Sequence, residues 1–78
     1  MKQLLEQYDF FFNGMCGGCA SRGEKRESWI HRNIKGIEIK IKPDETYFTA
    51  YERNQATGYG TSKESMEVIL KAMTQQPA

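Results

Sequence analysis

The chain has 78 residues, of which 38% are hydrophobic and 27% charged, and its formal net charge at pH 7 is +1. This length accommodates one domain over residues 1–78 and excludes a second, and the composition is that of a folded protein rather than a disordered one. The longest apolar run, Phe10-Phe11-Phe12, is far shorter than the roughly 20 residues that cross a bilayer, so we expect no membrane association. The first residues lack the apolar run of a secretory signal, which predicts a cytoplasmic protein.

The N-terminal part of the chain predicts a helix, a strand and a loop. Residues 1–7 are expected to form a short helix whose apolar anchors are Leu4 and Leu5. The aromatic segment 8–12 ends at an Asn-Gly pair and predicts a buried strand. Four glycines interrupt residues 13–23, so this segment is expected to be a loop.

A signal for the start of a helix lies at the end of this loop. Ser21-Arg22-Gly23-Glu24 matches a capping box, in which the serine hydroxyl accepts from an amide three residues on and the glutamate reaches back. It predicts a shorter middle helix over about residues 22–33, with Trp29 and Ile30 facing the core.

The hydrophobic period changes after Gly36. Isoleucine alternates with charged side chains over residues 37–41, which indicates a half-buried strand. Pro43 favours a turn, and the aromatic-rich segment 46–52 supplies the returning strand. The sequence therefore predicts a β-hairpin over about residues 37–52.

The C-terminal part predicts a loop and a helix. Residues 53–60 are expected to form a polar loop, and Thr61-Ser62-Lys63-Glu64 is a second capping box. Behind it, apolar side chains recur at i, i+3, i+4 and i+7 and form one helical face: Met66, Ile69, Leu70 and Met73. This pattern predicts a C-terminal helix over about residues 62–74 and a frayed tail over 75–78.

Together these elements predict a small α+β domain. Its antiparallel sheet contains the hairpin and is packed by the C-terminal helix, with the middle helix beside it. The expected core takes apolar side chains from the strands and the C-terminal helix, with Trp29 at its edge: Phe10, Phe12, Ile37, Ile39, Ile41, Phe48, Met66, Ile69, Leu70 and Met73.

Both cysteines lie in one glycine-rich motif, Cys16-Gly17-Gly18-Cys19. A strand that delivers CxxC to the start of a helix suits thioredoxin-like chemistry, in which Cys16 would attack as a thiolate and Cys19 would resolve. The same sulfurs are candidate zinc ligands, but zinc prefers four ligands and one chain offers too few. Because a small core often needs a staple, we expect any zinc to be shared between two such loops in a homodimer. If the motif does not bind zinc, we expect the protein to have no cofactor.

Basic side chains concentrate in the middle of the chain. Residues 21–42 contain seven basic and three acidic side chains, a net charge of +4. A basic segment with an aromatic residue inside it is typical of proteins that bind an anionic partner such as nucleic acid. A solvated helix face accounts for the same pattern without a partner. The candidate binding residues are Arg22, Lys25, Arg26, Trp29, His31 and Arg32.

The second half of the chain resembles a known unit. The sequence pattern that carries the resemblance is, in chain order, Ile37-x-Ile-x-Ile, a Pro-Asp turn, Tyr47 to Glu52, Gly58-Tyr59-Gly60-Thr61 and Glu64 to Leu70. Over about residues 36–74 this pattern resembles the ββα unit of HicB-type antitoxins, and it is similar to short phage and mobile-element proteins. The glycine-flanked CxxC with basic residues after it resembles other small phage proteins. The resemblance implies a viral protein of phage or mobile-element origin that acts in the host cytoplasm.

Three functional hypotheses stay open. The first is a non-enzymatic binding protein that docks on a host or partner macromolecule, as an inhibitor or an antitoxin-like regulator. The absence of a catalytic constellation in the sequence and the ββα resemblance favour it. The second is a minimal thioredoxin-like thiol oxidoreductase that uses Cys16 and Cys19. The third is a nucleic-acid-binding module with a zinc knuckle.

Overall fold

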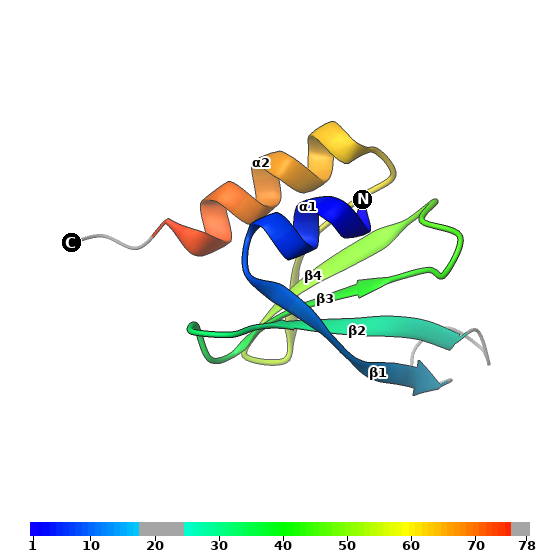
Figure 1. The fold of residues 1–78 in the computed structure, drawn as a ribbon, viewed down its shortest axis with the longest axis horizontal. Helices are drawn as coiled ribbons and strands as arrows, with labels where there is room; N and C mark the ends of the chain where they lie inside the picture. The colour runs from blue at the N-terminus through cyan, green and yellow to red at the C-terminus, as the bar shows by residue number, and fades with distance from the viewer. Residues whose placement is uncertain (18–24, 76–78) are drawn as a thin grey trace.

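The computed structural model describes residues 1–17 and 25–75, which form one antiparallel sheet and two helices. The strands lie in the sheet in chain order, each beside the next. Both helices cover the same face of the sheet, and no helix of the described residues lies on the other face (Figure 1). This arrangement confirms the expected α+β fold. The elements are α1 (Lys2–Gln7), β1 (Phe10–Gly17), β2 (Lys25–His31), β3 (Ile37–Ile41), β4 (Phe48–Glu52), β5 (Gln55–Gly60) and α2 (Lys63–Thr74).

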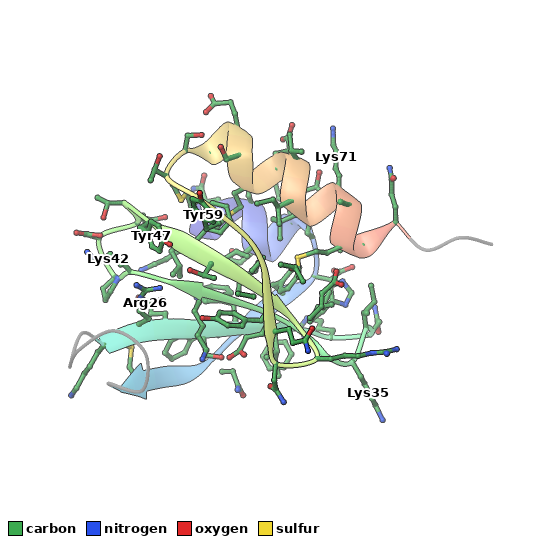
Figure 2. The ribbon with its side chains drawn as sticks, turned by 180° about the vertical axis from the view of Figure 1, so that it is seen from behind. Arg26, Lys35, Lys42, Tyr47, Tyr59 and Lys71 are labelled. Carbon is green, nitrogen blue, oxygen red and sulfur yellow. The ribbon has the colours of Figure 1, made fainter. Side chains whose placement is uncertain are left out.

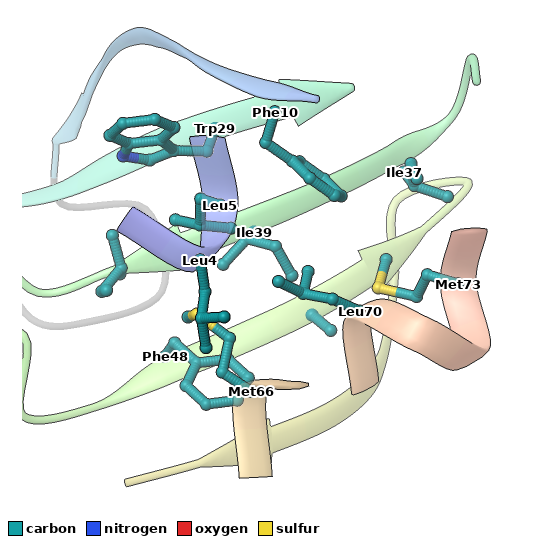
Figure 3. Packing of buried hydrophobic residues seen from close by; sticks show 12 residues of the cluster. Leu4, Leu5, Phe10, Trp29, Ile37, Ile39, Phe48, Met66, Leu70 and Met73 are labelled. Atoms are coloured by element: carbon teal, nitrogen blue, oxygen red, sulfur yellow. The ribbon is translucent and has the colours of Figure 1, made fainter. Parts of the chain in front are cut away.

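The hydrophobic core lies between the sheet and the helices (Figure 3). Three side chains of α2 are buried in it, and α1 adds Leu4 and Leu5, whose depth the sequence did not reveal. The sheet contributes the side chains that alternate toward the helices, among them the predicted isoleucines of β3. The buried set is Leu4, Leu5, Phe10, Trp29, Ile37, Ile39, Ile41, Phe48, Ala50, Met66, Leu70 and Met73, with Ile69 partly buried against it.

The predicted hairpin and C-terminal helix are confirmed. β3 and β4 pair antiparallel with Ile39 opposite Ala50. α2 begins one residue later than the second capping box suggests, because the capping side chain is Ser62 rather than Thr61: its hydroxyl oxygen accepts from the amide of Ser65 at 3.2 Å. Among the described residues, neither helix combines the length and the apolar character needed to cross a membrane.

The predicted middle helix is wrong, because residues 25–31 form the strand β2. β2 pairs with β1 on one side and β3 on the other, so tertiary pairing overrides the local helix signal. Alternation places Glu27 and Trp29 side by side toward α1, where the Trp29 Nε1–H donates to Glu27 at 3.2 Å and Lys2 Nζ pairs with Glu27 at 2.8 Å. The capping box at residues 21–24 lies outside the described residues.

The polar loop expected over residues 53–60 is also wrong, because most of it forms β5. A tight turn at Arg53 and Asn54 connects β4 to β5, and both residues have a positive φ, 52° and 67°. Turns of this kind match the twist of a hairpin, so they favour strand pairing on either side. The Gly58-Tyr59-Gly60 signal therefore belongs to an edge strand rather than to a loop.

The first strand differs from the prediction in length and in one core residue. It starts at Phe10 and continues to Gly17, through part of the segment expected to be a loop; residues 18–23 lie outside the described residues. The register with β2 shifts between Phe12 and Gly14, and Gly14 has a φ of 118°. Phe12 is 49% exposed rather than buried, since β1 runs away from both helices toward its C-terminal end (Figure 1). Of the expected frayed tail, residues 76–78 lie outside the described residues.

Candidate functional site

The face of the sheet without helices, called the open face below, carries an unusual mixture of aromatic and basic side chains. Strand register aligns Phe11, Ile30, Glu38 and Tyr51 in one row across this face. The next row contains Ser28, Lys40, Thr49 and Tyr59. Because side chains alternate along each strand, Arg26 and Tyr47 belong to the row after that.

At one end of the open face, a cationic side chain and two aromatic rings lie against one another. The guanidinium carbon of Arg26 lies 5.0 Å from the centroid of the Tyr47 ring, and its Nη1 donates to Thr49 Oγ1 at 3.3 Å. The Tyr47 and Tyr59 rings are stacked, with centroids 6.3 Å apart and planes at 28°. Tyr59 is 71% exposed, and it lies close to Tyr47 (Figure 2).

Two further pairs of a cation and a ring occupy the same face. Lys40 Nζ lies 4.7 Å from the centroid of the Tyr51 ring. The guanidinium carbon of Arg32 lies 5.3 Å from the centroid of Phe11. A cation over the face of a ring is attracted by the negative π cloud, which holds both groups in place. On the open face, positively charged side chains therefore lie next to aromatic rings.

Acidic side chains are sparse on this face. Among the described residues, alternation along β2 and β3 assigns Arg26, Lys40 and one acid, Glu38, to this face, and a further basic residue directly follows each of these two strands. The carboxylate of Glu38 accepts a short hydrogen bond from the Ser28 hydroxyl. The basic residues are Arg26, Arg32, Lys40 and Lys42. A charge ratio of this kind favours an anionic ligand.

A hollow of about 420 Å³ lies at the other end of the open face, between the turn that joins β2 to β3 and the turn that joins β4 to β5. Ile30 and Ile34 give it an apolar lining, and Tyr51 supplies an aromatic ring. Glu38 and Arg53 add opposite charges to its lining.

The sequence-predicted binding residues divide between different places. Arg26 and Arg32 lie on the open face, each over a ring. Lys25 is an exposed residue at the start of β2, where strand alternation directs it to the opposite side from Arg26. Trp29 is buried in the core between the sheet and the helices, so the structure separates it from the basic residues. Arg22 lies outside the described residues.

His31 is part of the turn that follows β2. Its Nδ1 accepts hydrogen bonds from the amides of Asn33 and Ile34, each at 3.0 Å, and its ring packs edge-to-face with that of Phe10, with the centroids 5.1 Å apart. The imidazole therefore holds the turn after β2 in place through Nδ1.

The cysteine motif is described only in part. The backbone of Cys16 lies in β1 opposite Arg26, and Cys19 lies outside the described residues. Residues 25–31, which form most of the helix expected to activate Cys16, belong to a strand. Within residues 1–17 and 25–75, no three His, Cys, Asp or Glu side chains gather as a metal site would require. The shared zinc site in a homodimer and the redox hypothesis stay predictions.

Sequence reasoning missed the aromatic residues of the open face. Tyr47 and Tyr51 were assigned to a strand but not to a surface, and Tyr59 was assigned to a loop. The signal was present in residues 47–51, where tyrosine and threonine alternate with the apolar Phe48 and Ala50. Side chains with a period of two take opposite faces, so the tyrosines had to face away from the core.

Comparisons with protein-family models, with curated proteins and with solved structures found no match. The chemistry of the open face is therefore the basis on which a function is inferred.

Proposed function

We propose that this chain is a non-enzymatic binding protein whose open face holds single-stranded nucleic acid. The observation that carries the proposal is the cluster of Arg26, Tyr47 and Tyr59 on the open face, in which the Tyr47 ring contacts a cation, Arg26, and is stacked with the exposed ring of Tyr59. Each group has a natural counterpart in a polynucleotide: the guanidinium pairs with a phosphate and the ring stacks on a base.

Single strands fit this face better than duplexes do. A base in a duplex is already stacked on its neighbours, whereas an unpaired base can lie flat on an exposed ring such as that of Tyr59. Stacking of this kind contributes about 1–3 kcal/mol per base, and it does not depend on the base because every base is aromatic. Arg26, Lys40 and Arg32 are distributed along the sheet, so a phosphate backbone that crosses the rings meets successive positive charges.

The alternative within the same class is docking of a host protein, as the resemblance of residues 36–74 to HicB-type antitoxins suggests. That resemblance stays a prediction, and so does an origin in phage. The open face favours nucleic acid more directly, because among its described residues the basic side chains outnumber the acidic ones, and the rings contact cations rather than forming an apolar patch.

Fluorescence anisotropy tests the proposal with a labelled ~12-nucleotide single strand and its duplex. We expect binding at low salt, with the single strand bound more tightly than the duplex. Tyr59→Ala should weaken binding of the single strand about tenfold, because about 1.4 kcal/mol of stacking is lost. Val68→Ala is the matched control, since Val68 is 69% exposed on α2, away from the open face, and its loss should change nothing. Absence of binding at low salt, or equal losses in the two variants, would contradict the proposal.

A further inference from the structure

The hollow beside Tyr51 is framed by two turns that hold each other in place. The Arg53 amide, in the turn between β4 and β5, donates to the carbonyl of Gly36 in the turn between β2 and β3 at 2.8 Å. His31 Nδ1 closes the second turn by accepting from two amides. Because these bonds are made within the chain, the hollow is formed before any ligand arrives.

The lining of the hollow combines three kinds of contact. Ile30 and Ile34 supply apolar surface, and the ring of Tyr51 supplies a flat wall. The carboxylate of Glu38 is the acidic acceptor in the lining, and Lys35 and Arg53 are its cations. A suitable ligand has a planar group that packs on Tyr51 and the isoleucines, hydrogen-bond donors on one edge for Glu38, and a negative charge nearby for Lys35 and Arg53. A nucleotide has this combination.

The hollow lies on the path of a strand bound to the open face. Tyr47 and Tyr51 are four residues apart in the same line, which corresponds to about 13 Å along the sheet. Tyr59 lies opposite Thr49, midway between them. A strand stacked on Tyr59 thus reaches the hollow within a few nucleotides. Lys35 lies at the opposite end of the molecule from Arg26 and Tyr47 (Figure 2).

We propose, resting on the function proposed above, that the hollow takes one base of the bound strand and that Glu38 selects guanine. A carboxylate has two acceptor oxygens, and the Ser28 hydroxyl engages one of them while leaving further lone pairs. Guanine presents two adjacent donors on its Watson–Crick edge, N1–H and the 2-amino group, which match the two oxygens. Thymine presents one donor and two acceptors there, and the acceptors would face the carboxylate with no proton between them.

The test compares ~12-nucleotide oligothymidylates that differ at a single central position. A guanosine at that position should tighten binding about tenfold over thymidine, the order of discrimination of a good bidentate pair. Inosine lacks the 2-amino group and should fall between the two. This comparison uses the unaltered protein, so it does not depend on the folding of a variant.

Glu38→Gln should abolish the preference for guanosine, measured as the ratio between the affinities for guanosine-containing and all-thymidine strands, so that any change common to both strands from the lost negative charge cancels. Glutamine keeps an acceptor for Ser28 but offers one oxygen and an amide donor in place of two oxygens. Glu67→Gln on α2 is the matched control and should keep the preference. Binding of all-thymidine strands without any guanosine preference overturns this inference alone. Failure of every strand to bind overturns the proposed function as well.

Discussion

The guanidinium group of Arg26 lies over the ring of Tyr47, 5.0 Å from its centroid, and also donates to the hydroxyl of Thr49. The two contacts join β2 to β4 across β3, which lies between them in the sheet. They hold the cation over Tyr47, whose ring is stacked with the exposed ring of Tyr59. A cation fixed in advance loses less side-chain entropy when a phosphate binds, so this relationship favours binding.

Two replacements of Arg26 distinguish the contribution of its positive charge to binding from that of its planar guanidinium group. Arg26→Ala should weaken single-strand binding and reduce the slope of log K against log salt by about one, because one phosphate contact is lost. Arg26→Lys should keep the slope but lose affinity, since an ammonium lacks the planar fork that stacks on Tyr47. Anisotropy titrations between about 50 and 200 mM salt measure both quantities. Lys71→Ala, on the exposed surface of α2, is the control and should leave the slope unchanged; an equal change in that variant would contradict the assignment.

Gly60 has no room for a side chain. A Cβ at this position would lie 2.8 Å from Phe48 Cε1 and 2.8 Å from Ser65 Cβ, both in well-packed surroundings. Gly60→Ala should therefore lower the free energy of unfolding by about 1–3 kcal/mol, the usual cost of overpacking. Gly58→Ala is the comparison on the same strand: its nearest neighbour is the flexible end of Ile69 at 3.2 Å, so its cost should be smaller. Urea denaturation of both variants measures this, and equal costs would contradict the packing at Gly60.

α1 is part of the core rather than an appendage. Leu5 is fully buried, and we expect Leu5→Ala to destabilise the protein by about 2–5 kcal/mol through loss of burial and the cavity left behind. The exposed Val68→Ala should change the free energy of unfolding by less than about 0.5 kcal/mol. Urea midpoints report the two values. A cost for Leu5→Ala as small as that of the control would show that α1 does not pack as described.

Glu45 connects the turn between β3 and β4 to the start of α1, and this contact should make stability depend on acid. Its carboxylate accepts from the Lys2 amide at 2.8 Å and lies 3.0 Å from the amino group of Met1, which lowers the pKa of Glu45 below its ordinary value of 4.5. A lowered folded pKa gives stability that is present above pH 4.5 and is lost as the pH falls through the folded value.

Glu45→Gln tests that dependence. The variant should be less stable at pH 7 by no more than about 1 kcal/mol, since Glu45 is partly exposed and solvent screens the pair. It should also lose part of the decrease in stability below pH 4.5. Glu52→Gln, at the end of β4, is the control and should keep the unaltered acid profile. Urea denaturation from pH 3 to pH 7 measures these profiles, and a variant with an unchanged profile would rule out the contact as its source.

Helices and strands were predicted correctly where apolar side chains recur with one clear period, helical or alternating, along the whole element. The alternating isoleucines of β3 and the apolar face of α2 are each imposed by burial on one side, and both predictions are confirmed. Residues 25–31 carry a weaker alternation, because Ser28 and Trp29 are adjacent and both buried. The strand there depends on pairing with β1 and β3, which are distant contacts that no local propensity records.

The candidate site was harder to predict than the fold. Sequence reasoning grouped Trp29 with Arg26 and Arg32 because all three lie in one basic segment. In a strand, neighbours take opposite faces, so Trp29 entered the core while Arg26 and Arg32 met rings on the open face. Three of the rings come from β1, β4 and β5, and Tyr47 directly precedes β4; only the sheet order and register bring these distant segments to one face.

The most direct test of the open face as a nucleic-acid interface uses the four tyrosines of the chain as separate probes. Tyr47, Tyr51 and Tyr59 lie on the open face, whereas Tyr8 ends α1 on the helix side of the sheet. NMR spectra of the tyrosine ring protons, recorded while a ~12-nucleotide single strand is added, distinguish these positions. We predict that the ring signals of Tyr47, Tyr51 and Tyr59 shift as the strand binds and that those of Tyr8 stay in place. Shifts confined to Tyr8, or no shift in any ring at low salt, would contradict the account.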